Sequence, residues 1–141
     1  MIALPQSRTG RASKGLGIAL WGVQGLLALV LVGGGLWKSA TPVEQVAEAF
    51  AWAAEMPALL RTTAAVDMLG GLGVLLPSLT RVQPRLTVLA ALGVVALQGS
   101  AIVFHFSRGE GADTGLNFVL VALALFVAWG RHRKAPIPSR G

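Results

Sequence analysis

Two ionisable side chains, Asp67 and His105, lie inside long apolar stretches of this 141-residue chain. An ionisable group in such a stretch is energetically costly unless it is paired or faces a cavity, so both residues are candidates for function. Histidine titrates near neutral pH and can exchange a proton with a neighbouring carboxylate. The two residue types therefore indicate either proton transfer or the binding of a ligand through polar contacts.

Four more polar side chains are expected near this pair. Gln98 precedes His105 by seven residues, which places both on one helical face, two turns apart. With a rise of about 1.5 Å per residue, Asp67 is expected about 9 Å below the level of Arg61. The sequence predicts one ligand-binding pocket in the outer half of a membrane, lined by Asp67, Gln98, His105, Asn117, Lys38 and Arg61.

A second interpretation of the same residues needs no ligand. Asp67 would bind Lys38, Arg61 or His105 in a buried hydrogen-bond network that stabilises the helices against one another. The gathering of polar groups on one side of the membrane favours a pocket, because groups that only join helices can lie at any depth. Both interpretations stay open at this point.

Composition limits the chemistry of the site. The chain has no cysteine, which excludes thiol redox chemistry, disulfides and covalent haem attachment. A metal site is not expected, because one histidine and one aspartate are too few ligands, and the second histidine, His132, falls in a tail on the opposite side. No catalytic residue is assigned. No cofactor-binding motif is visible, and the candidate cofactor is a quinone.

The apolar stretches themselves predict the architecture. They cover residues 15–37, 61–80, 86–107 and 114–130, and each approaches the roughly 20 residues that a helix needs to cross the hydrocarbon core. A content of 54% hydrophobic and 13% charged residues is far from that of a soluble domain. We predict an all-α integral membrane four-helix bundle. Its single domain spans residues 15–134, between a basic cytoplasmic tail (1–14) and a flexible tail (135–141).

Only the connection between the first two stretches is long. Thr41, Pro42 and Glu44 fit a capping box with proline in the first turn. Apolar residues then recur at helical spacing, with acidic residues on the opposite face. We expect a short amphipathic helix over about residues 42–56, on the extracytoplasmic surface.

The charged residues are sorted by side. Nine Lys and Arg residues, and no acidic residue, fall in the two tails and in the connection between the second and third stretches. Positive charge accumulates on the cytoplasmic side, so we expect a multi-pass protein of the bacterial inner membrane with both termini in the cytoplasm. The net charge of +6 is then a topology signal, and nucleic acid is not expected as a partner.

Four motifs follow one another in order: LWGVQ at 20–24, DMLGGLGVLLP at 67–77, LTVLAA at 86–91, and His105 followed by Gly109-Glu110 and Asn117. In order and spacing they resemble the DoxX-like family of small bacterial membrane proteins, over about residues 18–131. The resemblance implies a four-helix membrane bundle. The carboxylate of the second span is more commonly glutamate in that pattern, so Asp67 implies a different pocket geometry.

The resemblance also implies candidate roles, because relatives are associated with quinol oxidase or thiosulfate:quinone oxidoreductase complexes, and distant animal relatives are receptor-assembly chaperones. The leading hypothesis is an accessory or ligand-binding membrane protein whose outward-facing pocket takes a small hydrophobic molecule such as a quinone or a lipid. One alternative is a quinone-linked redox subunit that uses Asp67 and His105 for proton transfer, and another is an assembly chaperone. The expected partners are the lipid bilayer, a small hydrophobic ligand, and a membrane-protein partner or a second copy of the chain.

Overall fold

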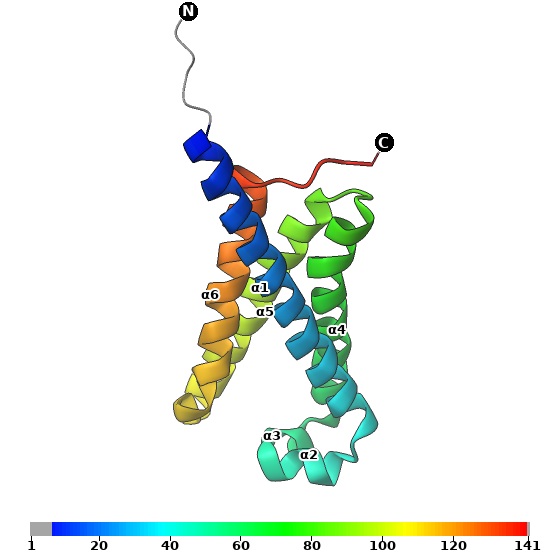
Figure 1. Cartoon of the computed structure of the whole chain (residues 1–141). Coiled ribbons are helices and arrows are strands. Elements are labelled where there is room, and N and C mark those ends of the chain that lie inside the picture. The colour runs from blue at the N-terminus through cyan, green and yellow to red at the C-terminus, as the bar shows by residue number, and fades with distance from the viewer. Residues whose placement is uncertain (1–6, 141) are drawn as a thin grey trace, which may run out of the picture.

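The computed structural model describes residues 7–140, with side chains from Lys14 onward, and no strand occurs in this range. The long helices are α1 (Ser7–Ala40), α4 (Pro57–Thr80), α5 (Arg85–Ser107) and α6 (Gly115–Trp129) (Figure 1). A 3-10 turn, η1 (Gly111–Thr114), precedes α6, and a π-helical turn, η2 (Gly130–Lys134), extends it. Four helical segments are long and apolar enough to cross a membrane. The predicted all-α membrane bundle is confirmed.

The helices are longer than the apolar stretches that predict them. Helix α1 begins at Ser7, so residues 7–14 of the predicted tail are helical, and residues 1–6 lie outside the described range. Residues 135–140 have no regular structure and lie against the turn between α4 and α5. There the backbone N–H of Arg140 donates to the Arg81 carbonyl over 2.8 Å, and Arg81 Nε donates to the Pro138 carbonyl over 3.1 Å.

The four long helices form two arms that separate toward one end of the molecule. Helices α1 and α4 make one arm and α5 and α6 the other, and the arms spread apart toward the end that carries α2 and α3 (Figure 1). We call this the α2–α3 end, and the opposite end, where the described chain starts and stops, the terminal end. One apolar core joins the arms, with Leu27, Leu31, Val74, Val94 and Leu120 among its buried residues.

Glycines let the helices of the first arm approach closely. A Cβ on Gly71 of α4 would meet Val32 at 2.9 Å and Leu31 at 3.1 Å, and a Cβ on Gly35 of α1 would meet the Ala64 carbonyl at 2.7 Å. Such close approach through small residues is typical of helix packing in membranes. The glycines of α4 therefore act in packing.

The predicted surface helix over residues 42–56 is two short helices, α2 (Val43–Ala49) and α3 (Trp52–Glu55). The capping-box prediction is wrong, because Pro42 occupies the N-cap position and no side chain caps the helix. The chain leaves the helix at Phe50, whose backbone is extended. The break lets Val46, Trp52 and Ala53 bury their side chains together against Leu60 of α4, which one straight amphipathic helix would not achieve.

Candidate functional site

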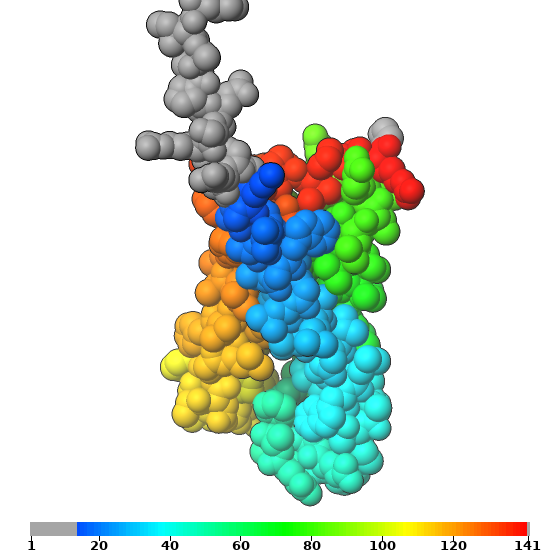
Figure 2. Space-filling view, in the orientation of Figure 1, coloured from blue at the N-terminus to red at the C-terminus, as the bar shows by residue number. Residues whose placement is uncertain are grey.

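A cavity of about 610 Å³ lies between the two arms at the α2–α3 end. Figure 2 shows it as a hollow between α6, in yellow and orange, and the cyan segment formed by the end of α1 and by α2. Its walls are mostly apolar, and the arms contribute Val30, Gly34, Leu97, Leu116 and Leu120 among other residues. Both the volume and the apolar lining are typical of small-molecule sites.

An ion pair joins α1 and α4 at the wall of the cavity. Lys38 Nζ lies 2.9 Å from Asp67 Oδ2, and the side chains are 21% and 9% exposed. Lys38 is in the last turn of α1, where a cation also interacts favourably with the helix dipole. Asp67 thus carries its charge at depth because a partner from the neighbouring helix meets it.

A pair of amides joins α5 and α6 on the facing wall. Asn117 Nδ2 donates to Gln98 Oε1 over 2.7 Å, and both side chains line the cavity. Each amide has further donor and acceptor capacity after this bond. The second arm therefore presents uncharged polar groups opposite the ion pair of the first.

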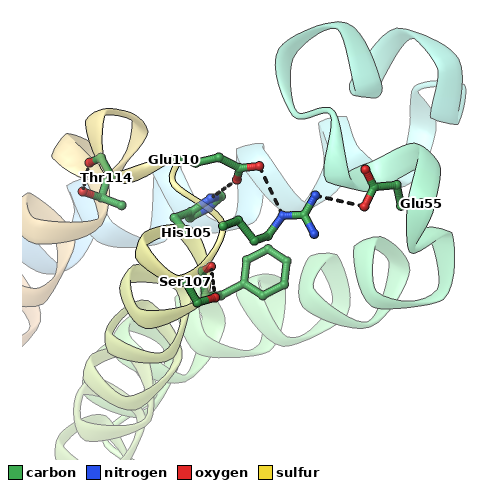
Figure 3. A network of polar contacts seen from close by, with 8 residues as sticks. Glu55, His105, Ser107, Glu110 and Thr114 are labelled. Carbon is green, nitrogen blue, oxygen red and sulfur yellow. Dashed lines mark hydrogen bonds and ion pairs between the residues drawn. The ribbon is translucent and has the colours of Figure 1, made fainter.

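His105 is held by a carboxylate that lies outside the helices. Its Nδ1 is 2.9 Å from Oε2 of Glu110, in the turn after α5 (Figure 3). An ionised carboxylate only accepts, so Nδ1 carries the proton of this bond. Arg108 Nε donates to Glu110 Oε1 over 3.2 Å, and Arg108 Nη2 donates to Glu55 Oε2 of α3 over 2.9 Å.

This ionic latch, made of Glu55, Arg108, Glu110 and His105, connects α3 to the turn that follows α5. The hydrogen bond from His105, together with Arg108, holds the pKa of Glu110 below its ordinary range. The bonds to Glu55 and Glu110 raise the pKa of Arg108. Glu110 and Arg108 are therefore both charged at neutral pH.

Five of the six predicted site residues line the cavity, and Arg61 does not. Arg61 Nη1 instead donates to the carbonyls of Lys38 and Ser39, each over 2.7 Å. These carbonyls belong to the last turn of α1, where no intrahelical partner is left for them. Arg61 therefore caps α1 and holds the backbone of Lys38 in place from outside the cavity.

Sequence reasoning missed the aromatic part of the lining. Trp37, Phe50, Trp52 and Phe104 all border the cavity. Trp52 and Phe104 meet edge to face with ring centroids 5.7 Å apart, and Trp37 and Phe50 do so at 6.5 Å. From sequence alone, an indole near a helix end is interpreted as an anchor at the membrane interface. The spacing of Trp52 does not indicate that its ring turns inward.

A family model described as the DoxX-like family matches residues 22–127. The chain belongs to the DoxX-like family. In the same comparisons, no curated protein and no solved structure matches the chain. Every residue that lines the cavity lies within the matched region. The family and the four apolar helices together make this a multi-pass membrane protein.

A second polar cluster of this DoxX-like protein lies toward the terminal end. Gln24 Nε2 donates to the Val74 carbonyl over 2.8 Å and to Ser78 Oγ over 3.0 Å, and Arg131 Nε donates to Gln24 Oε1 over 2.7 Å. Arg131 is only 5% exposed and lies over the Trp21 ring. In sequence Arg131 counts as one more basic tail residue, so only the fold shows that it is buried.

No group of three or more histidine, aspartate or glutamate side chains suited to a metal ion occurs among the residues that the structure describes. The polar groups that line the cavity are an ammonium, carboxylates, amides, hydroxyls and an imidazole. Set in apolar walls, such groups are suited to orient a small organic molecule through hydrogen bonds. Chemically, the arrangement supports the binding of a small molecule.

Proposed function

We propose that this DoxX-like protein is an accessory or ligand-binding membrane protein whose cavity takes a small hydrophobic molecule such as a quinone or a lipid. The observation that carries the proposal is a cavity of about 610 Å³, with mainly apolar walls, between helices of membrane-spanning length. Packed helices rarely leave a void of this size unless something fills it, because interiors are close-packed.

The polar lining supports a binding role. Lys38 and Asp67 satisfy each other, as do Gln98 and Asn117, so these four groups are hydrogen-bonded without a ligand. Each pair keeps spare hydrogen-bond donors, namely the remaining ammonium protons of Lys38 and the amide protons of Gln98 and Asn117. A ligand with oxygen acceptors would use these donors without breaking either pair.

The orientation forms part of the proposal. The terminal end lies in the cytoplasm of a bacterium and the cavity opens in the outer half of its inner membrane. Support comes from the basic residues gathered in the two tails and in the turn between α4 and α5, and from the acidic residues of α2, α3 and the turn before α6.

A quinone-linked redox role draws on one further observation. His105 lines the cavity and its ring bonds Glu110 at the rim, so the pair offers a route by which protons could reach a bound quinone. Asp67 is bound to Lys38 and not to His105, so the proton pair of this alternative is His105 with Glu110. Electrons would come from a partner membrane protein.

Two neighbouring glycines of α1 offer a matched test of the cavity. Gly34 lines it, whereas Gly33 is exposed, and a Cβ on either would meet nothing within 4 Å. Gly34→Leu should fill part of the cavity and weaken ligand binding by about tenfold or more, since overpacking costs roughly 1–3 kcal/mol. Gly33→Leu makes the same substitution on the outer face and should bind like the wild type.

Native mass spectrometry of each variant, purified with added ubiquinone or menaquinone, measures how much quinone is retained. Retention by the wild type and by Gly33→Leu, with loss in Gly34→Leu, supports the proposal. Equal retention in all three proteins would place any bound quinone outside the cavity and would reject the proposed site.

A further inference from the structure

The two ends of the molecule carry opposite charge. All six acidic residues of the sequence fall between residues 44 and 113, at the α2–α3 end or in the wall of the cavity, whereas the terminal end carries only basic residues. Among the described side chains, the exposed bases of that end are Lys14, Arg81, Arg85, Arg133, Lys134 and Arg140. No acidic residue of the chain lies near enough to neutralise them, so their counter-ions come from outside the protein.

A short segment crosses the terminal end and brings two of these bases together. We call this segment, residues 135–140, the strap; it runs from the end of α6 to the turn between α4 and α5 (Figure 1). Arg131 Nη1 donates to the carbonyl at the start of the strap over 2.9 Å. At its other end, the Arg140 N–H bonds the Arg81 carbonyl and Arg81 Nε bonds the Pro138 carbonyl. Arg81 and Arg140 therefore project from neighbouring points of the backbone.

Arg81 keeps binding capacity after these contacts. Its side chain is exposed, and neither of its Nη atoms has a hydrogen-bond partner among the described residues. A guanidinium group binds phosphate oxygens through two parallel N–H bonds, and arginine is favoured where phosphate is recognised. Arg140 and Arg85, the first residue of α5, add positive charge beside it. An anion among the three arginines would offset their mutual repulsion.

The turn between α4 and α5 indicates what kind of molecule carries this anion. Both helices are long and apolar enough to cross a membrane, so the turn between them lies at the membrane surface. Val82 in the turn is 56% exposed, and Leu79 and Leu86 on either side of it are exposed as well. Apolar side chains that alternate with bases are typical of segments at the level of the lipid headgroups. The anion is accordingly a phospholipid phosphate.

We propose that the strap and the turn between α4 and α5 form a binding site for the phosphate of an anionic phospholipid, held by Arg81, Arg85 and Arg140. A zwitterionic headgroup is disfavoured, because it would bring an ammonium group to a surface that carries only positive charge. The bound phosphate holds the strap across the end of the bundle and so joins α6 to the turn. The site lies at the opposite end from the cavity and needs no ligand there.

The test measures which phospholipid associates with the full chain in phosphatidylcholine vesicles. The vesicles contain a trace of spin-labelled phosphatidylglycerol or phosphatidylcholine, and electron paramagnetic resonance gives the fraction of each label held at the protein. Phosphatidylglycerol should be held at least about fivefold more strongly, and the difference should shrink at high salt. Both leaflets contain the label, so the direction of insertion does not affect the result. Equal association of the two lipids would overturn the proposal.

Two double variants locate the preference within the terminal end. Arg81→Gln with Arg140→Gln should abolish most of it, and Arg81→Lys with Arg140→Lys, which keeps the charges, should retain it. The matched control is Lys14→Gln with Arg133→Gln, which removes two exposed bases of α1 and η2, away from the turn, and should also retain it (Figure 1). An equal loss in the glutamine variant and in the control would mean that the charge of the whole end attracts the lipid, and would reject the site.

The strap can be followed directly because the chain has no cysteine. Ser139→Cys places one spin label on an exposed residue of the strap. The label should be less mobile in phosphatidylglycerol vesicles than in phosphatidylcholine vesicles, and adding Arg81→Gln should remove the difference. Equal mobility in the two lipids would show that the phosphate does not hold the strap, and would overturn that part of the proposal.

Discussion

Asp67 and Lys38 form a contact whose two halves come from different helices and depend on each other. Removing one partner of a fully buried ion pair leaves an uncompensated charge and costs about 3–5 kcal/mol. Lys38 keeps 21% of its side chain exposed, so water offsets part of that cost. The pair therefore contributes to the packing of α1 on α4 as well as to the lining of the cavity.

Asp67→Asn should lower the free energy of unfolding by about 1–3 kcal/mol, because the ammonium of Lys38 loses its partner. Combining Lys38→Met with Asp67→Leu removes both charges and should recover most of that loss. Thermal unfolding in detergent, followed by tryptophan fluorescence, measures Asp67→Asn, the double variant and its two single variants, Lys38→Met and Asp67→Leu. A double variant as unstable as the sum of its single changes would show that the two side chains are not coupled.

At the residue scale, sequence could predict which polar groups lie at cavity depth but not which atoms they bind. Asp67, Gln98, His105 and Asn117 are conspicuous because their neighbours are apolar. The partner of His105 is Glu110, a loop residue whose approach depends on the turn after α5. Nothing in a linear pattern distinguishes the buried Arg131 from the exposed bases beside it, because burial there depends on the contact with α1.

At the scale of elements, the short helices α2 and α3 are attached to the bundle by apolar packing and by the ionic latch. Trp52 and Ala53 pack against Leu60 of α4, while Glu55 reaches Arg108. His105 is buried, but Glu55, Arg108 and Glu110 are exposed or partly exposed, so the bonds among these three are weak singly and depend on ionisation. The apolar contacts hold the element in place, and the latch fixes its position relative to α5.

Acid should release the latch. The pKa of Glu110 is lowered by the hydrogen bond from His105 and then by Arg108. The ionised carboxylate therefore contributes stability at every pH above the ordinary glutamate range, and this contribution is lost as the pH falls through the lowered pKa. Glu48, Asp113, Glu55 and Arg108 are the other charged groups nearby, and Arg108 stays protonated throughout.

Acrylamide quenching of tryptophan fluorescence follows the release, because Trp52 becomes more accessible when α3 moves away from α5. Quenching should rise only below the ordinary range of a glutamate pKa. Glu110→Gln should show the increased quenching already at neutral pH. Glu44→Gln removes an exposed acid of α2 that makes no ion pair within the described residues, and a comparable rise in this variant would argue against a specific role for Glu110.

At the scale of the whole molecule, the sequence predicts a bundle of four membrane-spanning helices, but it does not predict how far the helices spread apart. The length and apolarity of the four stretches predict four helices of membrane-spanning length, and the structure confirms them. The spread of the arms could not be predicted, because it depends on how the helices pack in three dimensions, as at the close contact of Gly71 with α1. The cavity is a product of that spread.

The proposed orientation of the bundle places both ends of the chain in the cytoplasm. Alkaline phosphatase fused after residue 141 should be inactive, and green fluorescent protein at the same point should fluoresce, because the basic tails favour the cytoplasm. Fusions inserted between α2 and α3 should give the opposite pattern. An active phosphatase at the C-terminus would place the cavity in the inner half of the membrane.

Two arms that meet at one end and spread at the other respond to the thickness of the bilayer around them. Membrane helices tilt to match their apolar length to the local hydrocarbon thickness. A thicker bilayer makes the arms more upright and brings the α2–α3 ends together, while a thinner one spreads them. We therefore expect the volume of the cavity to depend partly on the surrounding lipid. A change of membrane composition would then change the size of the molecule that fits between the arms.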